Sequence, residues 1–371
     1  MKLNHTISSS LLNLPGFRTK RKIVIFESDD WGSIRMPSHE IYQQLLKKDI
    51  RVDNLAFTKY DSLASEKDLT LLFEVLNSVR DKNGNPAIIT ANTIVTNPDF
   101  EKIKSSGFRD YYYEPFTETL KRYPEHARSF ELWKEGIEMR VFRPQFHGRE
   151  HLNVTAWMKA LREDKGKAKL AFDYEMFDLS ESDNVNENTF VEALDLQNKD
   201  ELEFQKESII TGLKLFEKLF GYKSKTFMAP CYIWSSELNN TLYESGIKAF
   251  QGNWFQFDPI EGTERKFKKR FHFLGQKNSN NQIYMVRNAA FEPTSEPHFD
   301  WITEVIEKMQ LLFRLGKPVI INTHRINFIG FIDPINREKN LQLFKVLLNS
   351  MLKKWPEIEF MSSDQLTDLI S

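Results

Sequence analysis

The sequence predicts an α/β protein in which short, mainly parallel strands form a distorted (β/α) barrel. Short apolar runs alternate with segments of helical periodicity along the chain, which is typical of a parallel sheet covered by helices. Eight such runs fit a barrel, and 371 residues are compatible with one elaborated domain, 1–371. Three of the runs end in carboxylates or histidines, at the strand ends where such folds bind ligands.

The expected elements follow from the apolar pattern in chain order. Apolar residues recur with helical spacing over 209–220 and 302–313, and Ser236 and Gly246 are placed to begin and end another helix. The expected strands are 23–27, 87–91, 139–143, 169–173, 225–229, 247–251, 318–323 and 357–361.

The first strand ends in two adjacent carboxylates, Asp29 and Asp30, followed by Trp31 and Gly32. Adjacent residues at the end of a strand point in different directions, so one aspartate can bind a metal while the other faces the atom that the metal activates. A divalent cation would also relieve the repulsion between the two charges. Asp-Asp before Gly is also common in ordinary turns, which is the alternative.

Two later strands deliver histidines. His147 and His151 lie four residues apart after the strand-like 139–142, and histidines at this spacing on a helix share one face and can converge on one ion. Two surface histidines at the start of a helix are the alternative. The apolar run 317–321 leads into His324. Three separate strand ends therefore present candidate metal ligands and acid–base groups.

In their order along the chain, these motifs resemble those of the polysaccharide deacetylases of the NodB-homology, carbohydrate-esterase type. The family's Thr-Phe-Asp-Asp-Gly is similar to residues 27–32, its His-x-x-x-His to 147–151, and its Leu-x-His to 322–324. Its Arg-x-Pro-x-Gly is matched in part by 228–232, and its Asp-Trp by 300–301. The resemblance covers about residues 22–370 and implies that family's barrel. An insertion at about 50–135 is expected, because the first two motifs are unusually far apart.

The resemblance implies a role for each matching residue. Asp30, His147 and His151 would bind a divalent metal, most often Zn²⁺, Asp29 would be the general base, and His324 would be the general acid that protonates the leaving amine. General chemistry agrees, because a metal lowers the pKa of bound water toward ~7 and a nearby carboxylate can take its proton. The second donor to the oxyanion would be a backbone N–H, that of Cys231.

One motif departs from the family. Met228 stands where the family has the arginine that orients the base, and Arg287, which closes the strand-like 282–286, is our first candidate to replace it. An exposed surface ion pair is the alternative for any single arginine. Substrate contacts are expected from five residues near the motifs: Trp31, Pro230, Tyr232, Trp254 and Arg287. The ring of Trp254 could stack on a sugar or pack in the core.

The composition fits a soluble enzyme with a large core, because 40% of the residues are hydrophobic and the net charge is −1. Without a basic bias, nucleic acid is not an expected partner. The single cysteine, Cys231, excludes an intramolecular disulfide and a Cys-rich zinc site. Residues 1–16 lack the apolar core of a signal peptide and no segment approaches the ~20 apolar residues of a membrane span, so a cytoplasmic location is expected.

Together these features predict a metal-dependent hydrolase that removes an N-acetyl or related acyl group from an amino sugar or glycan by cleaving its amide C–N bond. The expected cofactor is a divalent metal, most often Zn²⁺, and the expected partner is an N-acetylated carbohydrate. Two alternatives stay open: a hydrolase of a non-sugar amide on the same scaffold, and a catalytically silent glycan-binding protein. The oligomeric state is not indicated by the sequence.

Overall fold

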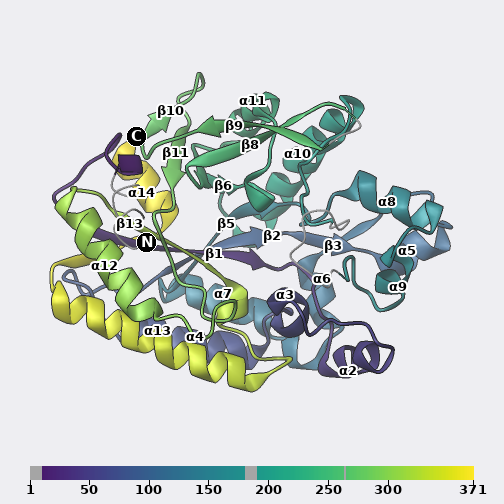
Figure 1. Cartoon of the computed structure of the whole chain (residues 1–371), viewed down its shortest axis with the longest axis horizontal. Helices are drawn as coiled ribbons and strands as arrows, with labels where there is room; N and C mark the ends of the chain where they lie inside the picture. Colours follow the sequence, from purple (N-terminus) through teal and green to yellow (C-terminus); the bar gives the residue numbers. More distant parts are fainter. Residues whose placement is uncertain (1–10, 180–189, 263–264) are drawn as a thin grey trace.

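The computed structural model describes residues 11–179, 190–262 and 265–371, and its central feature is a mostly parallel sheet (Figure 1). The strands lie in the order β10-β11-β7-β6-β5-β2-β1-β13-β12, and β14 pairs with the first residues of β1. The pairs β3–β4 and β8–β9 form two small antiparallel sheets. The strands are β1 (Lys22–Trp31), β2 (Ile89–Ile94), β3 (Thr96–Pro98), β4 (Tyr113–Pro115), β5 (Phe142–Gly148), β6 (Thr226–Met228), β7 (Ala249–Gly252), β8 (Phe255–Ile260), β9 (Lys266–Phe271), β10 (Gln276–Lys277), β11 (Ile283–Val286), β12 (Ala289–Ala290), β13 (Val319–His324) and β14 (Ile358–Phe360).

Strand β1 lies at the centre of the sheet and is buried on both faces. Its residues 23–26 are all apolar and inaccessible to solvent, because helices or other strands cover each side and no polar face is needed. The parallel strands β2 and β13 flank it. In the β1–β13 register Asp29 is opposite His324, so two of the strand ends identified in the sequence are neighbours.

Helices cover the sheet on two sides. In Figure 1, α4, α7, α12 and α13 lie below the sheet, α10 and α11 lie above it, and α5, α8 and α9 extend to the right. The largest apolar core joins β1, β2 and β13 to the lower helices, and a second core lies between α10 and the strands β5 to β7. The helices are α2 (His39–Lys47), α3 (Ala56–Tyr60), α4 (Glu66–Asn77), α5 (Phe100–Ser105), α6 (Phe116–Lys121), α7 (Ser129–Glu138), α8 (Val154–Glu163), α9 (Ala168–Asp173), α10 (Asp200–Phe220), α11 (Asn239–Glu244), α12 (Trp301–Arg314), α13 (Pro334–Lys354) and α14 (Ser363–Ile370), with short 3₁₀ turns η1 (Pro124–His126), η2 (Pro230–Tyr232), η3 (Ser236–Leu238) and η4 (Arg325–Asn327).

The two ends of the sheet approach each other at one point. Strand β11 pairs with β7 and strand β12 pairs with β13, and only Arg287 and Asn288 separate β11 from β12. The Arg287 N–H donates to the carbonyl of Gly252 in β7, and the Asn288 N–H donates to the carbonyl of Ile320 in β13. The structure confirms the α/β class and the mostly parallel sheet. A closed barrel is not detected among the described strands.

Several expected elements need correction. The segment 169–173 is not a strand, because its residues form most of α9, and a short apolar run alone does not distinguish a buried strand from a short helix. Helix-like structure begins after Ser235, which accepts a hydrogen bond from the Glu237 N–H, one residue earlier than the expected Ser236. The expected insertion at 50–135 stays a prediction; the segment contains β2 of the central sheet and the helices α3 to α6, and α7 begins within it.

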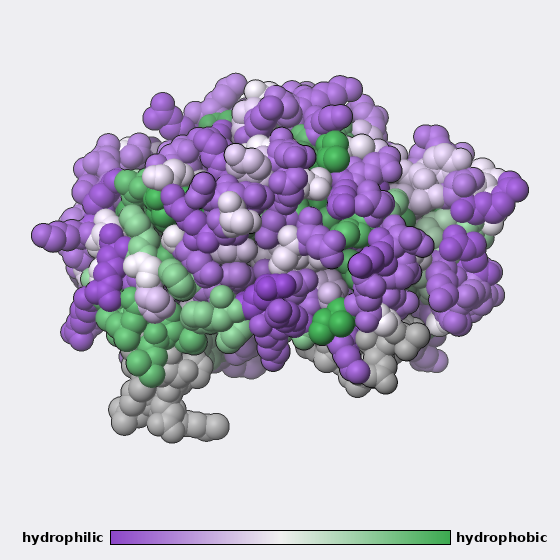
Figure 2. Space-filling model, turned by 90° about the horizontal axis from the view of Figure 1, so that it is seen from above, coloured by the Kyte–Doolittle hydropathy of each residue, from purple (hydrophilic) through white to green (hydrophobic). Residues whose placement is uncertain are grey.

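The surface is mostly hydrophilic, and hydrophobic residues gather in a few patches on the face shown in Figure 2. The two longest described helices, α10 and α13, each have 21 residues and carry charges along their length. Within the described ranges, no helix is both long and apolar enough to cross a membrane.

Candidate metal centre and active site

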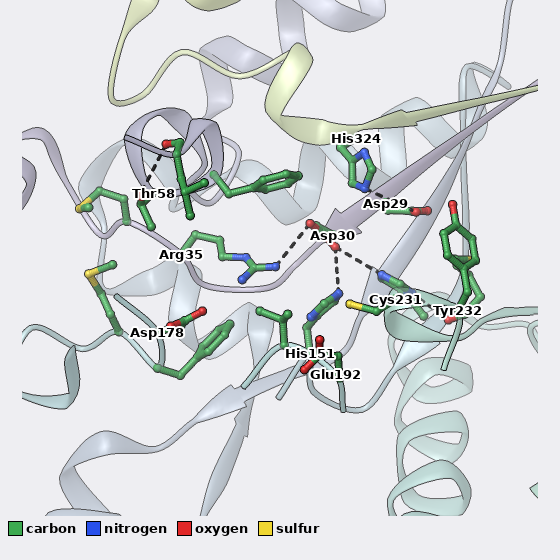
Figure 3. A pocket seen from close by; sticks show the side chains of 18 of the residues that line it. Asp29, Asp30, Arg35, Thr58, His151, Asp178, Glu192, Cys231, Tyr232 and His324 are labelled. Atoms are coloured by element: carbon green, nitrogen blue, oxygen red, sulfur yellow. Dashed lines mark hydrogen bonds and ion pairs between the residues drawn. The ribbon is translucent and has the colours of Figure 1, made fainter. Parts of the chain in front are cut away.

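The ends of β1, β5 and β13 bring the sequence-predicted residues together (Figure 3). Asp30 has φ 72°, in the left-handed region, and the β1–β2 register shifts between Ser28 and Trp31. Aspartate tolerates this conformation better than most residues. The irregular strand end turns the side chains of Asp29 and Asp30 to different partners.

Asp30, His147 and His151 form a compact, buried group. The Nε2 atoms of both histidines lie 3.3 Å from the same oxygen, Oδ1 of Asp30. The three candidate ligand atoms all lie within 4.8 Å of one another. Ligands at ~2.0–2.1 Å from a tetrahedral Zn²⁺ are themselves about 3.3–3.4 Å apart. The two histidine–aspartate separations match this value, and the third separation is within 4.8 Å, so the group could hold a metal ion.

The tautomer of His147 also fits a cation. Its Nδ1 lies 2.8 Å from the backbone carbonyl of Met228, and because a carbonyl can only accept, Nδ1 must donate. In the neutral ring, Nε2 then carries a lone pair that faces the Asp30 carboxylate. Two facing acceptors repel each other unless a proton or a cation lies between them.

The surroundings of this group favour a neutral His151 and an ionised Asp30. Burial lowers the pKa of His151 to about 3, against the opposing attraction of Asp30. Burial raises the pKa of Asp30, but its interactions with His151, His147 and Arg35 outweigh it and hold that pKa well below its usual range. An ionised carboxylate and neutral imidazoles are the protonation states that bind a metal.

The local structure that presents the two histidines differs from the expectation. His147 is the second-last residue of β5, and His151 lies in the bend before α8, so the pair does not share a helix face. Gly148 separates them with φ 145°, which breaks the strand and returns the chain toward Asp30. The ring centroids still lie 5.1 Å apart, because the turn brings the rings together from consecutive elements.

Asp29 lies beside this group and is held by Arg287, which lies between β11 and β12. The Nη1 and Nη2 atoms of Arg287 each donate to one carboxylate oxygen of Asp29, both at 2.7 Å, and Asn92 donates to Oδ1 at 2.7 Å. Burial raises the pKa of Asp29, but the charge and hydrogen bonds of Arg287 outweigh it and lower that pKa to about 2. Asp29 is therefore a carboxylate at neutral pH.

Arg287 is the centre of a buried charge network. Its side chain is 3% exposed, and its Nε donates to Glu27 at 2.7 Å. Burial raises the pKa of Glu27, and the Arg287 charge opposes that rise. Although residue 228 is a methionine, Asp29 is still paired with a cation, because Arg287 contacts it from the break between β11 and β12.

His324 lies across from Asp29 and has its own carboxylate partner. Its Nδ1 is 2.7 Å from Oε1 of Glu292, and its Nε2 is 3.9 Å from Oδ2 of Asp29. Burial lowers the pKa of His324, but the charge and hydrogen bond of Glu292 outweigh it and raise that pKa to about 10. Asp300, matched to the family by sequence, instead caps α12 by accepting from the Thr303 N–H.

The loop after β6 has an unusual backbone. Cys231 and Tyr232 have φ values of 55° and 61°, and both line the pocket beside Asp29 and Asp30. Desolvation raises the pKa of the Cys231 thiol well above its usual range, which argues against a thiolate nucleophile. The Tyr232 hydroxyl lies 3.3 Å from Nη1 of Arg287. Pro230 is buried and does not line this pocket.

Trp31 and Trp254, both predicted to contact substrate, do not line this pocket. Trp31 is 1% exposed, packs edge-on against Phe142 and Trp133, and donates to Ser28, so it is a core residue. Trp254 lines a neighbouring cavity, and Tyr232 and Asn322 line both that cavity and the pocket, so its contact with substrate stays a prediction.

Four functional candidates were missed in the sequence: Glu27, Asn92, Glu292 and Asn322. Asn322 lies within β13 and accepts a hydrogen bond from Arg287 Nη1, in the place of the family's leucine. Asn92 and Glu292 follow the same pattern as the motifs, because each is a polar residue near the carboxyl end of a strand. A search of every strand end, rather than of recognised motifs alone, could have identified these two residues.

A pocket of about 490 Å³ opens over this group, and Figure 3 shows Arg35, Thr58 and Asp178 on the side of Asp30 away from Asp29. The Nη2 of Arg35 lies 3.5 Å from Oδ2 of Asp30, and its Nε lies 3.6 Å from Asp61. The arrangement offers a cation site, a carboxylate, a protonated imidazole and room for a small substrate.

Comparisons with known proteins give likenesses of the whole chain to several solved structures. No protein-family model matches the sequence, and no curated protein matches it. A protein from Mycobacterium smegmatis described as a polysaccharide deacetylase is 9% identical with a TM-score of 0.46, over 96% of this chain and 93% of its own. PuuE allantoinase is 10% identical with a TM-score of 0.46, over 94% and 90%. A 4-α-glucanotransferase from Thermococcus litoralis is 11% identical with a TM-score of 0.46, and the match covers 94% of this chain but 40% of that enzyme. At these values, the likenesses do not assign an activity.

Proposed function

We propose that this protein is a metal-dependent hydrolase that removes an N-acetyl or related acyl group from an amino sugar or glycan, on a distorted (β/α) barrel. One observation carries the proposal: Asp30, His147 and His151 converge with the spacing of a metal site, and Asp29 and His324 flank them. The five residues come from three segments far apart in sequence: the end of β1, the segment from β5 to α8, and the end of β13. An ordinary turn at Asp29 and Asp30 would not require this convergence.

Each side chain has a chemical task in amide hydrolysis. A divalent cation held by Asp30, His147 and His151 would supply an activated water and polarise the amide carbonyl. Asp29, kept ionised by Arg287, accepts the proton of the attacking water. The water oxygen bonds to the carbonyl carbon, the C–N bond breaks, and the amine leaves with a proton.

His324 is the donor of that proton. Its Nδ1 faces Glu292, so the N–H on Nε2 is directed toward the pocket and Asp29. With a raised pKa the ring is an imidazolium at neutral pH, as a general acid must be before it acts. The loop of Cys231 and Tyr232 borders the same pocket, and we assign the oxyanion contact to the Cys231 N–H.

The structure weakens the argument for a catalytically silent glycan-binding protein. That alternative rested on the missing arginine of the third motif, whose task is to orient the base. Arg287 binds both oxygens of Asp29 from the break between β11 and β12, so the orientation is retained without that motif. The alternative of a non-sugar amide keeps support, because apolar side chains line much of the pocket.

An acyl-release assay tests the proposal. Zinc-loaded protein should release acyl groups from N-acylated glucosamine, and Asp29→Asn should reduce kcat at least ~100-fold while metal remains bound. Asp258→Asn is the control, because Asp258 is a buried carboxylate paired with Arg270 in the β8–β9 hairpin, outside the pocket. Full activity of Asp29→Asn would remove the base assignment. If metal-loaded protein cleaves no amide, the proposed hydrolase function is wrong.

A further inference from the structure

Part of the pocket lining is apolar. Leu55 precedes α3 as its N-cap and Phe57 lies within that helix, whereas Met176 and Phe177 follow α9, so these residues come from segments outside the central sheet. We refer to six apolar residues of the lining as the apolar wall: Met36, Leu55, Phe57, Met176, Phe177 and Val191.

Two polar groups of the pocket lining are engaged with the protein. The Thr58 hydroxyl donates to a backbone carbonyl at 2.8 Å, and Glu192 forms an ion pair with Arg265 at 2.6 Å. The guanidinium of Arg35 lies over the Phe177 ring, 5.2 Å from its centroid. A polyhydroxylated ring pressed against the six apolar side chains would lose water and receive few hydrogen bonds in return.

The wall reaches the reacting groups. The ring of Phe57 meets the ring of His324 edge-on, with centroids 5.4 Å apart and planes at 84°. A group attached next to the scissile amide would therefore contact the wall while His324 faces the leaving nitrogen. Met36 and Met176 are buried in a core cluster with Leu45, so the wall is supported from behind and formed before a ligand binds.

We infer that the substrate amide carries an apolar group of several carbon atoms next to its scissile bond, and that this group packs between α3 and the segment after α9. The inference rests on the proposed function and narrows its substrate class beyond acetamides. The apolar group is either the acyl chain, released as a fatty carboxylate, or part of the amine. In both cases one water adds to the carbonyl carbon, the C–N bond breaks, and the nitrogen leaves protonated.

Two substrate series test whether the apolar group belongs to the acyl chain or to the amine. The first varies the acyl group of N-acyl-glucosamine from acetyl to octanoyl, and the second varies the amine of an N-acetyl-alkylamine from methyl to octyl. In one series kcat/KM should rise about fourfold per added methylene until the wall is covered. A best substrate with acetyl in the first series and methyl in the second would overturn the inference.

Binding of the products provides a readout without catalysis. Octanoate or octylamine should bind metal-free protein at least ~10-fold more tightly than acetate or methylamine in calorimetric titration, with a negative heat-capacity change from apolar burial. Equal affinities for the short and long products would contradict the inference. Tight octanoate or octylamine binding by protein that cleaves no amide would instead remove the proposed function alone.

Leu55→Asn tests the wall with little risk to folding. Leu55 is the N-cap of α3 and makes no side-chain cap hydrogen bond, and Asn is favoured at that position. The variant should reduce the preference for octanoyl or octyl over the short substrate by about 10-fold. Ile335→Asn is the control, because Ile335 is an apolar residue 71% exposed on α13, and it should leave the preference unchanged. An unchanged preference in Leu55→Asn would place the apolar group elsewhere and contradict the inference.

Discussion

Arg287 and Asp29 form the buried ion pair on which the proposed mechanism depends. Both oxygens of Asp29 receive a guanidinium donor at 2.7 Å, and the same arginine also donates to Glu27. Removing the cation would leave two buried carboxylates without a counter-charge, which typically costs ~3–5 kcal/mol. A conservative substitution is therefore the more informative experiment.

Arg287→Lys should keep the charge and lose the two-pronged contact with Asp29. We expect kcat to fall about 10- to 100-fold with little change in KM or metal content, because the variant misplaces the base rather than the substrate. Steady-state kinetics together with metal analysis measure these effects. Arg270→Lys is the control, since Arg270 pairs with Asp258 in the β8–β9 hairpin. A variant with normal kcat would show that Arg287 does not position the base.

Glu292 should control the pH range in which His324 acts. Its charge and hydrogen bond raise the pKa of His324 to about 10, against the lowering effect of burial. In Glu292→Gln the pKa of His324 falls. The alkaline limb of the pH profile of kcat should therefore move to lower pH by roughly 1–2 units. The pH profile of kcat measures the shift.

Glu307→Gln serves as the control for this profile, because Glu307 is exposed on α12. A purely structural role for Glu292 would lower activity at all pH values without moving the alkaline limb. That result would show that Glu292 does not control the pKa of His324.

At the scale of elements, β14 is tied to the rest of the sheet by a buried carboxylate. Glu359 is 4% exposed and accepts from Arg21 at 2.8 and 2.6 Å, with Lys82 at 3.0 Å. The hydrogen bond with Arg21 lowers the pKa of Glu359 to about 2. A lowered pKa in the folded state contributes stability above the unfolded value, near 4.5, and this contribution is lost as pH falls toward 2.

Glu359→Gln should therefore lower the free energy of unfolding by about 2–3 kcal/mol at pH 7, and by much less at pH 3. Urea unfolding at both pH values measures this difference. Glu357→Gln is a close control, because Glu357 belongs to the same segment but is half exposed in its pair with Lys22. An equal loss at pH 7 and pH 3 would show that Glu359 acts through packing and not through its charge.

The apolar pattern of the sequence predicted the central strands, but it did not predict where their backbone becomes irregular. Apolar runs identified β1 and β13, because both are buried on two faces and carry no polar alternation. Their register, which places Asp29 opposite His324, depends on the packing of the whole sheet. Arg287 was the first candidate to orient Asp29, but its contact with both carboxylate oxygens could not be derived from the sequence, because the two residues lie 258 positions apart.

The errors have a common physical origin in local geometry. Spacing alone suggested a helix for His147 and His151, but the strand continues to Gly148 and its backbone then turns sharply. The register shift at the end of β1 buries Trp31, which a regular strand would not have indicated. In both cases one residue with an uncommon backbone conformation decides where its neighbours point.

At the scale of the molecule, the metal site links segments that are distant in the chain. Asp30 belongs to β1, and the two histidines follow from β5, on the other side of β2 in the sheet. A bound cation would therefore stabilise the folded state in proportion to its affinity. Removal of zinc with a chelator should lower Tm by a few degrees, and added zinc should restore it. A Tm that does not respond to zinc or chelator would indicate that the site does not hold that ion.

The metal content of purified, zinc-equilibrated protein tests the central claim most directly. Mass spectrometry should find about one zinc per wild-type chain and far less in His151→Ala, a substitution suited to the test because Nδ1 of His151 has no hydrogen-bond partner within the described residues. His39→Ala, on α2 outside the pocket, should retain the wild-type content. Equal zinc in wild type and His151→Ala, or none in either, would contradict the account.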